Sequence, residues 1–217
     1  MYKILFIDEQ KEAHDDFLDY VDSFSMTDIE AHTMLPYSTI EETIDAIMLE
    51  NPDAVISDFE LNGHRTDISY NVPYNGVDLV IKFQAIRNEF PCFIMTAFDY
   101  QAVHSSNDVN IVYVKNILHN PEKGTITFLD RVKEQIRHYK AKISNAETEL
   151  QRLLELKRAG NVTLNDEAKI IELDSLLEHA IDKRTAIPSE YKSLSNQKQL
   201  SELMDKVDEL INKLENR

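Results

Sequence analysis

Short apolar runs alternate with amphipathic stretches through the first half of the chain. Five runs, each bounded by polar residues, lie at 3–7, 29–34, 53–59, 92–95 and 111–114. Between them, apolar residues recur every three or four positions, as they do on one face of a helix. Strands that alternate with helices typically form a parallel sheet covered by helices on both faces. The pattern therefore predicts a doubly wound α/β domain with a five-stranded parallel sheet.

Local signals refine this prediction. Polar Glu30 and His32 alternate with apolar residues in the second run, which predicts a strand at the edge of the sheet. Thr39 and Glu42 have the spacing of a capping box and mark the start of a helix. His14 lies early in a helix predicted over residues 11–23, and we expect its side chain to be exposed.

The second half of the chain has a longer apolar repeat. Apolar residues recur with strict three-four spacing at Leu129, Val132, Ile136, Tyr139, Ile143, Ala146, Leu150 and Leu153. This repeat covers about four heptads and predicts a coiled-coil seam on one helix over residues 125–158. Because such a helix extends beyond a compact domain, its far half requires a partner.

Turn signals divide the remainder of the chain into further helices. Gly160-Asn161 predicts the end of the long helix, and Thr163 with Asp166 predicts the start of the next one. The short connection favours an antiparallel hairpin. A third helix is predicted from about residue 196. We therefore expect a first domain at 1–128 and an all-α tail, a hairpin or coiled coil, at 129–217.

Composition and charge exclude several classes of protein. The chain has a net charge of −16, and residues 1–128 carry 22 acidic and 7 basic side chains against 17 and 16 in the remainder. No basic region is present, so nucleic acid is not an expected partner. No apolar run is long enough to span a membrane, and the chain enters its first strand without a signal peptide, so we expect a cytoplasmic protein. The single cysteine, Cys92, excludes an intrachain disulfide.

Polar side chains stand where the predicted strands end. Asp8-Glu9 follows the first strand and Asp58 lies in the third, while Thr96 and Lys115 follow the fourth and fifth. Carboxyl ends of parallel strands meet at one edge of a sheet, so these side chains are expected to lie together. Crowded carboxylates repel one another, and a hard divalent cation with oxygen ligands relieves the repulsion. Lys115 and Thr96 supply a positive charge and a hydroxyl donor for an anionic group.

An acidic pair, an Asp, a Thr and a Lys in this order resemble the receiver domain of response regulators over about residues 1–128. The resemblance implies a flavodoxin-like fold in which a histidine kinase or phosphotransfer protein phosphorylates Asp58. It further implies that Thr96 and Lys115 contact the phosphoryl oxygens. The Mg²⁺ ligands that it implies are Asp8, Glu9, Asp58 and the backbone carbonyl of Glu60. Such a domain accepts and slowly loses its own phosphoryl group, so we expect no separate catalytic activity.

Three features depart from the simplest receivers. The segment 59–74 is longer than usual, and its Arg65, Tyr70 and Tyr74 either approach the site or belong to an inert surface flap. Asn116 replaces the proline that commonly follows the lysine, which leaves a cis or a trans bond open. Val112 replaces an aromatic residue. Tyr113 comes one position later, so strand alternation predicts that it points to the opposite face.

The helical tail is expected to carry the output. The leading hypothesis is a response regulator that signals through a protein target of the tail, with a homodimer formed through the tail. One alternative is a DNA-binding transcriptional regulator, which the near-neutral tail and the heptad-like repeats disfavour. Another alternative is a phosphotransfer or phosphatase protein that uses tail residues such as His138 or His179. An exposed histidine on a helix is more often an ordinary surface residue.

Overall fold

The computed structural model describes residues 1–62, 67–97, 109–119 and 126–192. The chain divides into two compact units, Met1–Ala141 and Lys142–Arg217. No helix in the described part of the chain is both long and apolar enough to cross a membrane.

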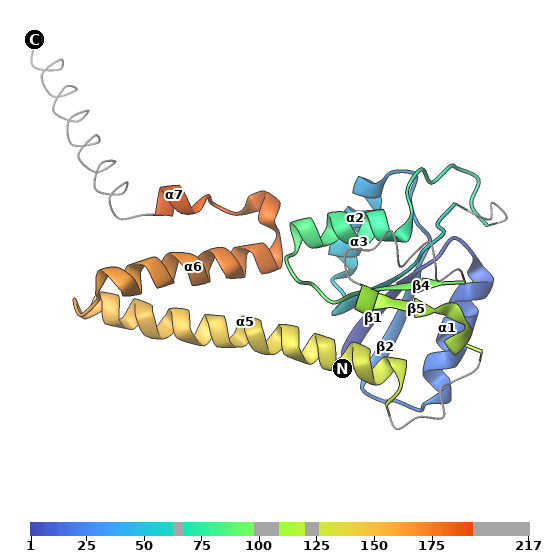
Figure 1. Cartoon of the computed structure of the whole chain (residues 1–217), viewed down its shortest axis with the longest axis horizontal. Coiled ribbons are helices and arrows are strands. Elements are labelled where there is room, and N and C mark those ends of the chain that lie inside the picture. The colour runs from blue at the N-terminus through green and yellow to red at the C-terminus, as the bar shows by residue number, and fades with distance from the viewer. Residues whose placement is uncertain (63–66, 98–108, 120–125, 193–217) are drawn as a thin grey trace, which may run out of the picture. The chain divides into compact units, whose positions relative to one another are not determined.

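The first unit is built on a five-stranded sheet in which all neighbouring strands are parallel (Figure 1). Its strands are β1 (Tyr2–Ile7), β2 (Ile29–Met34), β3 (Ala54–Asp58), β4 (Cys92–Thr96) and β5 (Val112–Val114). They lie in the order β2-β1-β3-β4-β5, which is the flavodoxin-like order. The predicted fold class and the edge position of β2 are therefore confirmed.

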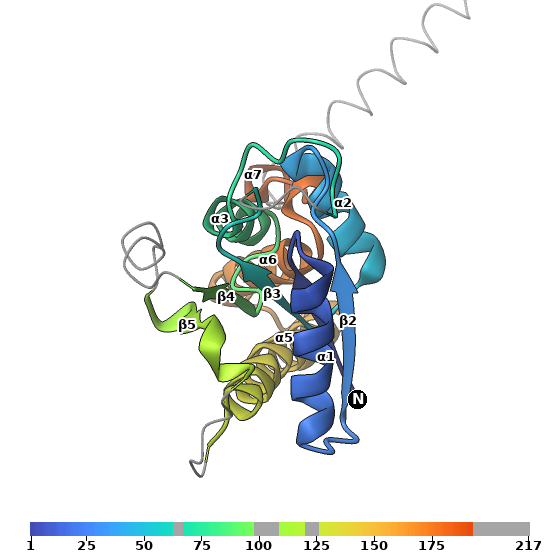
Figure 2. The ribbon, with the colours of Figure 1, turned by 90° about the vertical axis from the view of Figure 1, so that its right-hand side faces the viewer.

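Helices cover both faces of this sheet (Figure 2). They are α1 (Lys11–Ser23), α2 (Ile40–Glu50), α3 (Gly76–Ile86) and the first turns of α5 (Phe128–Arg158). One apolar core joins the sheet to α2 and α3, with Ile44 and Phe83 among its members. A second core joins the opposite face to α1 and α5, with Phe17 and Leu129 among its members. Two short 3₁₀ helices, η1 (Val109–Ile111) and η2 (Lys115–Ile117), flank β5.

Side-chain caps fix where several helices begin. The predicted capping box of α2 is present, because Thr39 accepts from the Glu42 amide and the Glu42 side chain returns to the Thr39 amide. Asn75 and Asp78 form the same arrangement at α3. Thr127 and Asp130 form it at α5, which begins at Phe128, whereas residue 125, the predicted start, lies outside the described residues.

The strand β5 places the side chains of Val112 and Tyr113 on opposite faces of the sheet, as predicted. Val112 packs on the core that contains α2 and α3, and Tyr113 packs on the core that contains α1 and α5. The Tyr113 ring lies 4.6 Å from the Phe128 ring, centroid to centroid. No cis peptide bond occurs in the described residues, so the bond between Lys115 and Asn116 is trans.

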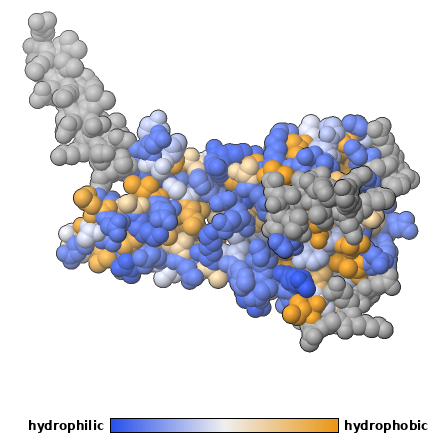
Figure 3. Space-filling model, viewed as in Figure 1, coloured by the Kyte–Doolittle hydropathy of each residue, from blue (hydrophilic) through white to orange (hydrophobic). Residues whose placement is uncertain are grey.

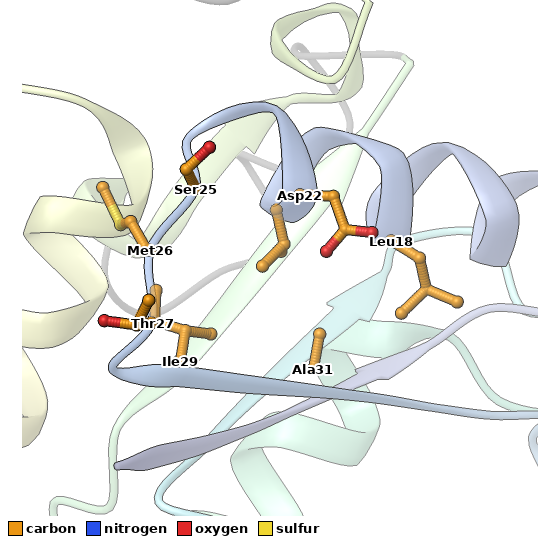
Figure 4. Close-up of a pocket in the computed structure, with 8 residues that line it drawn as sticks. Leu18, Asp22, Ser25, Met26, Thr27, Ile29 and Ala31 are labelled. Atoms are coloured by element: carbon orange, nitrogen blue, oxygen red, sulfur yellow. The ribbon is translucent and has the colours of Figure 1, made fainter.

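The helix α1 differs from prediction at His14. This residue was expected to be exposed, but it is buried with 8 % of its surface accessible. Leu18, farther along α1, is half-buried and borders an open pocket between the second half of α1 and β2 (Figure 4). The pocket is lined by Leu18, Val21, Asp22, Ser25, Met26, Thr27, Ile29 and Ala31. It lies at the end of α1 remote from Asp8 and Glu9.

The predicted apolar seam of α5 is divided between two cores. Leu129, Val132 and Ile136 are fully buried in the first unit, and Tyr139 packs against Phe90 there with ring centroids 5.6 Å apart. The first compact unit therefore extends to Ala141 rather than stopping at residue 128. Its last helix supplies core side chains beyond the predicted boundary.

The second unit contains the predicted helical hairpin (Figure 1). The end of α5 is followed by Gly160, whose φ of +74° suits glycine, and Thr163 caps α6 (Leu164–Ile181). Ala146 and Leu153 of α5 are buried against Leu173 of α6. A 3₁₀ helix, η3 (Lys183–Thr185), and the short α7 (Ser189–Lys192) follow. The helix predicted from residue 196 lies outside the described residues.

Hydrophobic side chains also remain on the surface of the second unit (Figure 3). Among the described residues of this unit, four large apolar side chains are exposed: Leu164, Ile181, Ile187 and Tyr191. Lys192 of α7 pairs with Asp174 and Glu178 of α6 at 2.6 Å each. The hairpin thus covers the far half of the α5 seam and leaves a separate apolar set in contact with solvent.

Candidate functional site

Three carboxylates converge at the carboxyl edge of the sheet. Ile7 of β1 pairs in register with Ser57 of β3, so the next residues, Asp8 and Asp58, emerge side by side. The side chains of Asp8, Glu9 and Asp58 each place an oxygen within 4.8 Å of the others. All three residues are buried, with 0 %, 1 % and 6 % of their surfaces accessible. Parallel strand ends therefore assemble the predicted acidic cluster.

Lys115 reaches this cluster from the end of β5, the strand at the opposite edge of the sheet from β2. It follows β5, and its Nζ lies 2.6 Å from Oδ2 of Asp8 and 3.2 Å from Oδ1 of Asp58. These distances correspond to charge-assisted hydrogen bonds in which the ammonium group donates. A residue 57 positions beyond Asp58 in sequence thus neutralises part of the charge of the buried carboxylates.

The surroundings of Asp58 change its acidity. Burial is the largest effect and raises the pKa of this carboxyl to about 7, against the opposing charge of Lys115. The neighbouring charges of Asp8 and Glu9 add to the rise. For Lys115, burial lowers the pKa of the ammonium group, but the two carboxylates outweigh burial and the net direction is upward. Lys115 is therefore a permanent cation beside a carboxyl that titrates near neutrality.

Thr96 and Glu60 lie close to the acceptor along the chain and the sheet. Met95 pairs in register with Asp58, and Thr96 follows it at the end of β4 with 1 % of its surface accessible. The backbone amide of Glu60 donates to Oδ2 of Asp58 at 3.1 Å. This bond fixes the acceptor side chain from its own loop. The predicted roles of the Thr96 hydroxyl and the Glu60 carbonyl remain predictions.

The start of α3 is packed directly on the acceptor. The amide of Gly76 donates to the carbonyl of Phe59 at 2.9 Å. A β-carbon at position 76 would overlap the carbonyl oxygen of Asp58 and crowd the hydroxyl of Ser57. That hydroxyl in turn donates to the Asp58 carbonyl at 3.0 Å. Gly76 lies in α3 and does not adopt the left-handed conformation that favours glycine. Glycine is therefore required at this position by the close approach alone.

The two tyrosines in the described part of the segment 59–74 bind the loop that precedes α2. The hydroxyl of Tyr70 donates to the Pro36 carbonyl at 2.6 Å, and that of Tyr74 donates to the Tyr37 carbonyl at 2.8 Å. Both rings therefore tie the segment to the loop between β2 and α2. Its apolar residues Leu61, Ile68, Val72 and Tyr74 are buried in the core with α2 and α3. Arg65 lies outside the described residues.

Two residues near the acidic cluster escaped the sequence-based prediction. His14 places its Nε2 atom 3.0 Å from the backbone oxygen of Asp8. The signal for its burial is its spacing, because His14, Phe17 and Val21 follow a three-four pattern on α1. Asp67 accepts from the amide of Lys11 at 3.0 Å. No local pattern indicates this contact, because it joins segments 56 positions apart.

The donor atoms of the cluster fit a magnesium ion. Mg²⁺ prefers hard oxygen ligands and is often held by one or two carboxylates together with a substrate phosphate. The described residues bring three carboxylates together in a buried position, where their mutual repulsion is costly. Asp8, Glu9 and Asp58 would hold the ion. The cluster is therefore chemically suited to the cofactor predicted from the sequence.

Comparisons with known proteins find no match in sequence and only distant matches in structure. No family model and no curated protein matches the sequence. Solved structures with a similar fold include the anti-anti-sigma factor PhyR from Bartonella quintana, at 15 % identity and a TM-score of 0.44. That match covers 67 % of this chain and 51 % of the PhyR chain. The RcsB response regulator of Salmonella typhimurium is 12 % identical over 81 % of this chain and 91 % of its own, with a TM-score of 0.38.

By their printed names, PhyR is an anti-anti-sigma factor and RcsB is a response regulator, and matches this distant carry no argument about the present chain. The flavodoxin-like fold of the first unit is established by its strand order. The residues at the carboxyl edge must therefore carry any argument about activity.

Proposed function

We propose that this chain is a receiver-type response regulator that accepts a phosphoryl group on Asp58. The observation that carries the proposal is the position of Lys115, which contacts both Asp8 and Asp58 at 2.6 and 3.2 Å. A lysine shared by two buried carboxylates is a ready partner for the oxygens of an incoming phosphoryl group. The phosphodonor would be the phosphohistidine of a partner kinase or phosphotransfer protein.

The proposed step is an in-line transfer. An oxygen of ionised Asp58 attacks phosphorus and forms an acyl phosphate, while the bond from phosphorus to the imidazole nitrogen of the donor breaks. That nitrogen keeps the electron pair of the broken bond. Lys115 moves its contact from the carboxylate to a phosphoryl oxygen, and the Thr96 hydroxyl donates to another. A bound Mg²⁺ would neutralise the charge shared by the phosphoryl group and the carboxylates.

The environment of Asp58 suits this role. Burial raises its pKa to about 7, and a bound cation would favour the ionised form that attacks phosphorus. Its low exposure limits the access of water to the acyl phosphate. The amide of Glu60 holds the carboxylate in one orientation. These features together favour a phosphoryl acceptor over a structural aspartate.

The helical tail is proposed to pass the signal to a protein partner. It begins as a continuation of α5, whose first turns belong to the core of the receiver unit. The basic side chains of the tail are balanced by acidic ones, which favours a protein surface over DNA as the target.

The acceptor is tested by intact-mass spectrometry after incubation with Mg²⁺ and a small-molecule phosphodonor. The unaltered protein should gain one phosphoryl group that is lost at alkaline pH, and Asp58→Asn should gain none. The matched control is Asp19→Asn, which removes an exposed carboxylate from α1 and should label as the unaltered protein does. Equal labelling of Asp58→Asn would exclude this function.

A further inference from the structure

The acidic turn after β1 is held at both ends by residues that belong to neither the strand nor the cluster. We infer that His14 and Asp67 are positioning residues for the Asp8–Glu9 pair, and that Asp67 connects the long segment 59–74 to metal binding. This inference rests on the proposed function, because it concerns the Mg²⁺ site of the receiver.

His14 fixes the backbone at the beginning of the turn. Its Nε2 atom lies 3.0 Å from the backbone oxygen of Asp8. A carbonyl oxygen only accepts hydrogen bonds, so Nε2 carries the proton and donates. The imidazole is buried and packs edge-on against Phe6 of β1, with ring centroids 6.1 Å apart. The peptide that links the two acidic residues is therefore anchored from α1.

Asp67 fixes the chain at the end of the turn. Gln10 occupies the N-cap position of α1, and its side chain makes no capping bond. Oδ2 of Asp67 instead accepts from the amide of Lys11, the first helical residue, at 3.0 Å. A carboxylate at this position satisfies an amide of the first turn and interacts favourably with the helix dipole. The carboxylate that caps α1 thus belongs to the segment 59–74, which follows the acceptor Asp58 in the chain.

Asp8 closes the turn from within. Its Oδ1 atom accepts from the amide of Gln10 at 2.9 Å, while its Oδ2 atom accepts from Lys115. Oδ1 is therefore oriented by the backbone that His14 and Asp67 hold, and Oδ2 is oriented by Lys115. If either anchor is lost, the Asp8 and Glu9 oxygens are no longer held at the separation that a small cation demands.

The segment 59–74 acquires a role from this arrangement. Between Asp58 and Gly76 it contacts the loop before α2 through Tyr70 and Tyr74, and it caps α1 through Asp67. The described residues 67–74 therefore link the acidic turn to the loop before α2. In this arrangement they brace the site.

Two pairs of matched variants test the inference in the full-length protein. His14→Gln keeps a donor near the position of Nε2, and His14→Leu removes it. Asp67→Asn keeps an oxygen acceptor, and Asp67→Ala removes it, although both remove the same charge. Titration calorimetry should give His14→Leu and Asp67→Ala about tenfold weaker Mg²⁺ binding, as for other residues that orient metal ligands. His14→Gln and Asp67→Asn should bind close to the unaltered protein.

Amide hydrogen exchange provides a second readout without metal. The Gln10 amide, bonded to Asp8, should exchange faster in His14→Leu and Asp67→Ala than in their matched partners. Thermal unfolding distinguishes a positioning role from a general loss of stability. A purely structural effect would lower the melting temperature of a variant without changing its Mg²⁺ affinity.

Each outcome has a distinct meaning. Equal Mg²⁺ affinity within both pairs, with unchanged exchange at Gln10, would overturn the inference and leave the proposed function intact. If the unaltered protein binds no Mg²⁺ and takes up no phosphoryl group, the proposed function itself fails. Weaker binding only in the variants that lack the donor or acceptor supports the assignment of both positioning residues.

Discussion

The α-carbon of Gly76 lies so close to the carbonyl oxygen of Asp58 that no side chain fits between them. This contact joins the first residue of α3 to the acceptor through backbone atoms alone. Residue 76 therefore controls where the Asp58 peptide lies.

Gly76→Ala is expected to destabilise the protein by roughly 1–3 kcal/mol, the usual cost of overpacking a closed site. It should also reduce phosphorylation of Asp58, because the overlap is relieved only if the acceptor peptide moves. Denaturant unfolding and intact-mass labelling measure the two effects. Gly160→Ala is the control: no atom crowds that position, and its left-handed backbone alone costs roughly 1–2 kcal/mol. It should label normally, and equal labelling of both variants would contradict the role of Gly76.

The acidic pair supplies charge that a cation offsets. Asp8→Asn/Glu9→Gln should weaken Mg²⁺ binding and Asp58 phosphorylation together, by at least about tenfold each. The matched control, Asp15→Asn/Asp19→Asn, makes the same change in net charge on the exposed side of α1. Calorimetric titration measures the affinity. Unaltered Mg²⁺ affinity in the Asp8/Glu9 variant would show that these residues are not ligands.

Tyr74 gives the stability of the protein a dependence on alkaline pH. Burial raises the pKa of its hydroxyl to about 12, above the value near 10 for an unfolded chain. The folded state then holds this proton more tightly. The associated stability is complete below pH 10 and is lost as pH rises from about 10 to 12.

Tyr74→Phe should remove this dependence. Between pH 9 and 11 the unaltered protein should lose roughly 1 kcal/mol more of its unfolding free energy than the variant does. At neutral pH the variant should be less stable by roughly 1–3 kcal/mol, since the carbonyl of Tyr37 loses its donor. Urea unfolding at each pH measures both effects. Tyr191→Phe, at an exposed tyrosine, is the control and should follow the unaltered protein.

The homodimer predicted from the heptad pattern stays a prediction, but the surface that would form it is a different one. The hairpin already covers the far half of the α5 seam, so that seam no longer requires a second chain. The exposed Ile181 and Ile187 are instead the apolar surface that a second chain would cover. Light scattering should show a dimer of the full chain and a monomer for Ile181→Glu/Ile187→Glu. Leu164→Glu, at the hairpin turn, should stay dimeric, and a monomeric unaltered protein would exclude the dimer.

Much of the fold is predictable because its signals are local. The capping residues Thr39, Asn75 and Thr163 each accept from the amide three positions later, so a short stretch of sequence predicts each helix start. The alternation in β2 likewise records its edge position. The acidic cluster was predictable because parallel strands bring their carboxyl ends to one edge.

Features that depend on distant partners were not predictable in this way. The burial of His14 depends on Phe6 and on the carbonyl of Asp8, and the cap of α1 comes from Asp67. The extent of the first unit was underestimated because the repeat in α5 is continuous, whereas the partners of Val132 and Ala146 belong to different cores. A single apolar repeat along α5 therefore gave no indication that its two halves pack in different cores.

The single cysteine lies where labelling reagents do not reach it. Cys92 begins β4 with 2 % of its surface accessible, and burial raises the pKa of its thiol far above the usual range. Thiolate is the reactive form, so the natural chain should remain unmodified by maleimides while it is folded. A cysteine introduced at an exposed position such as Asp19 or Tyr191 would then be the only site of attachment. Fluorescent or spin probes can therefore be placed on this protein without first replacing a native residue.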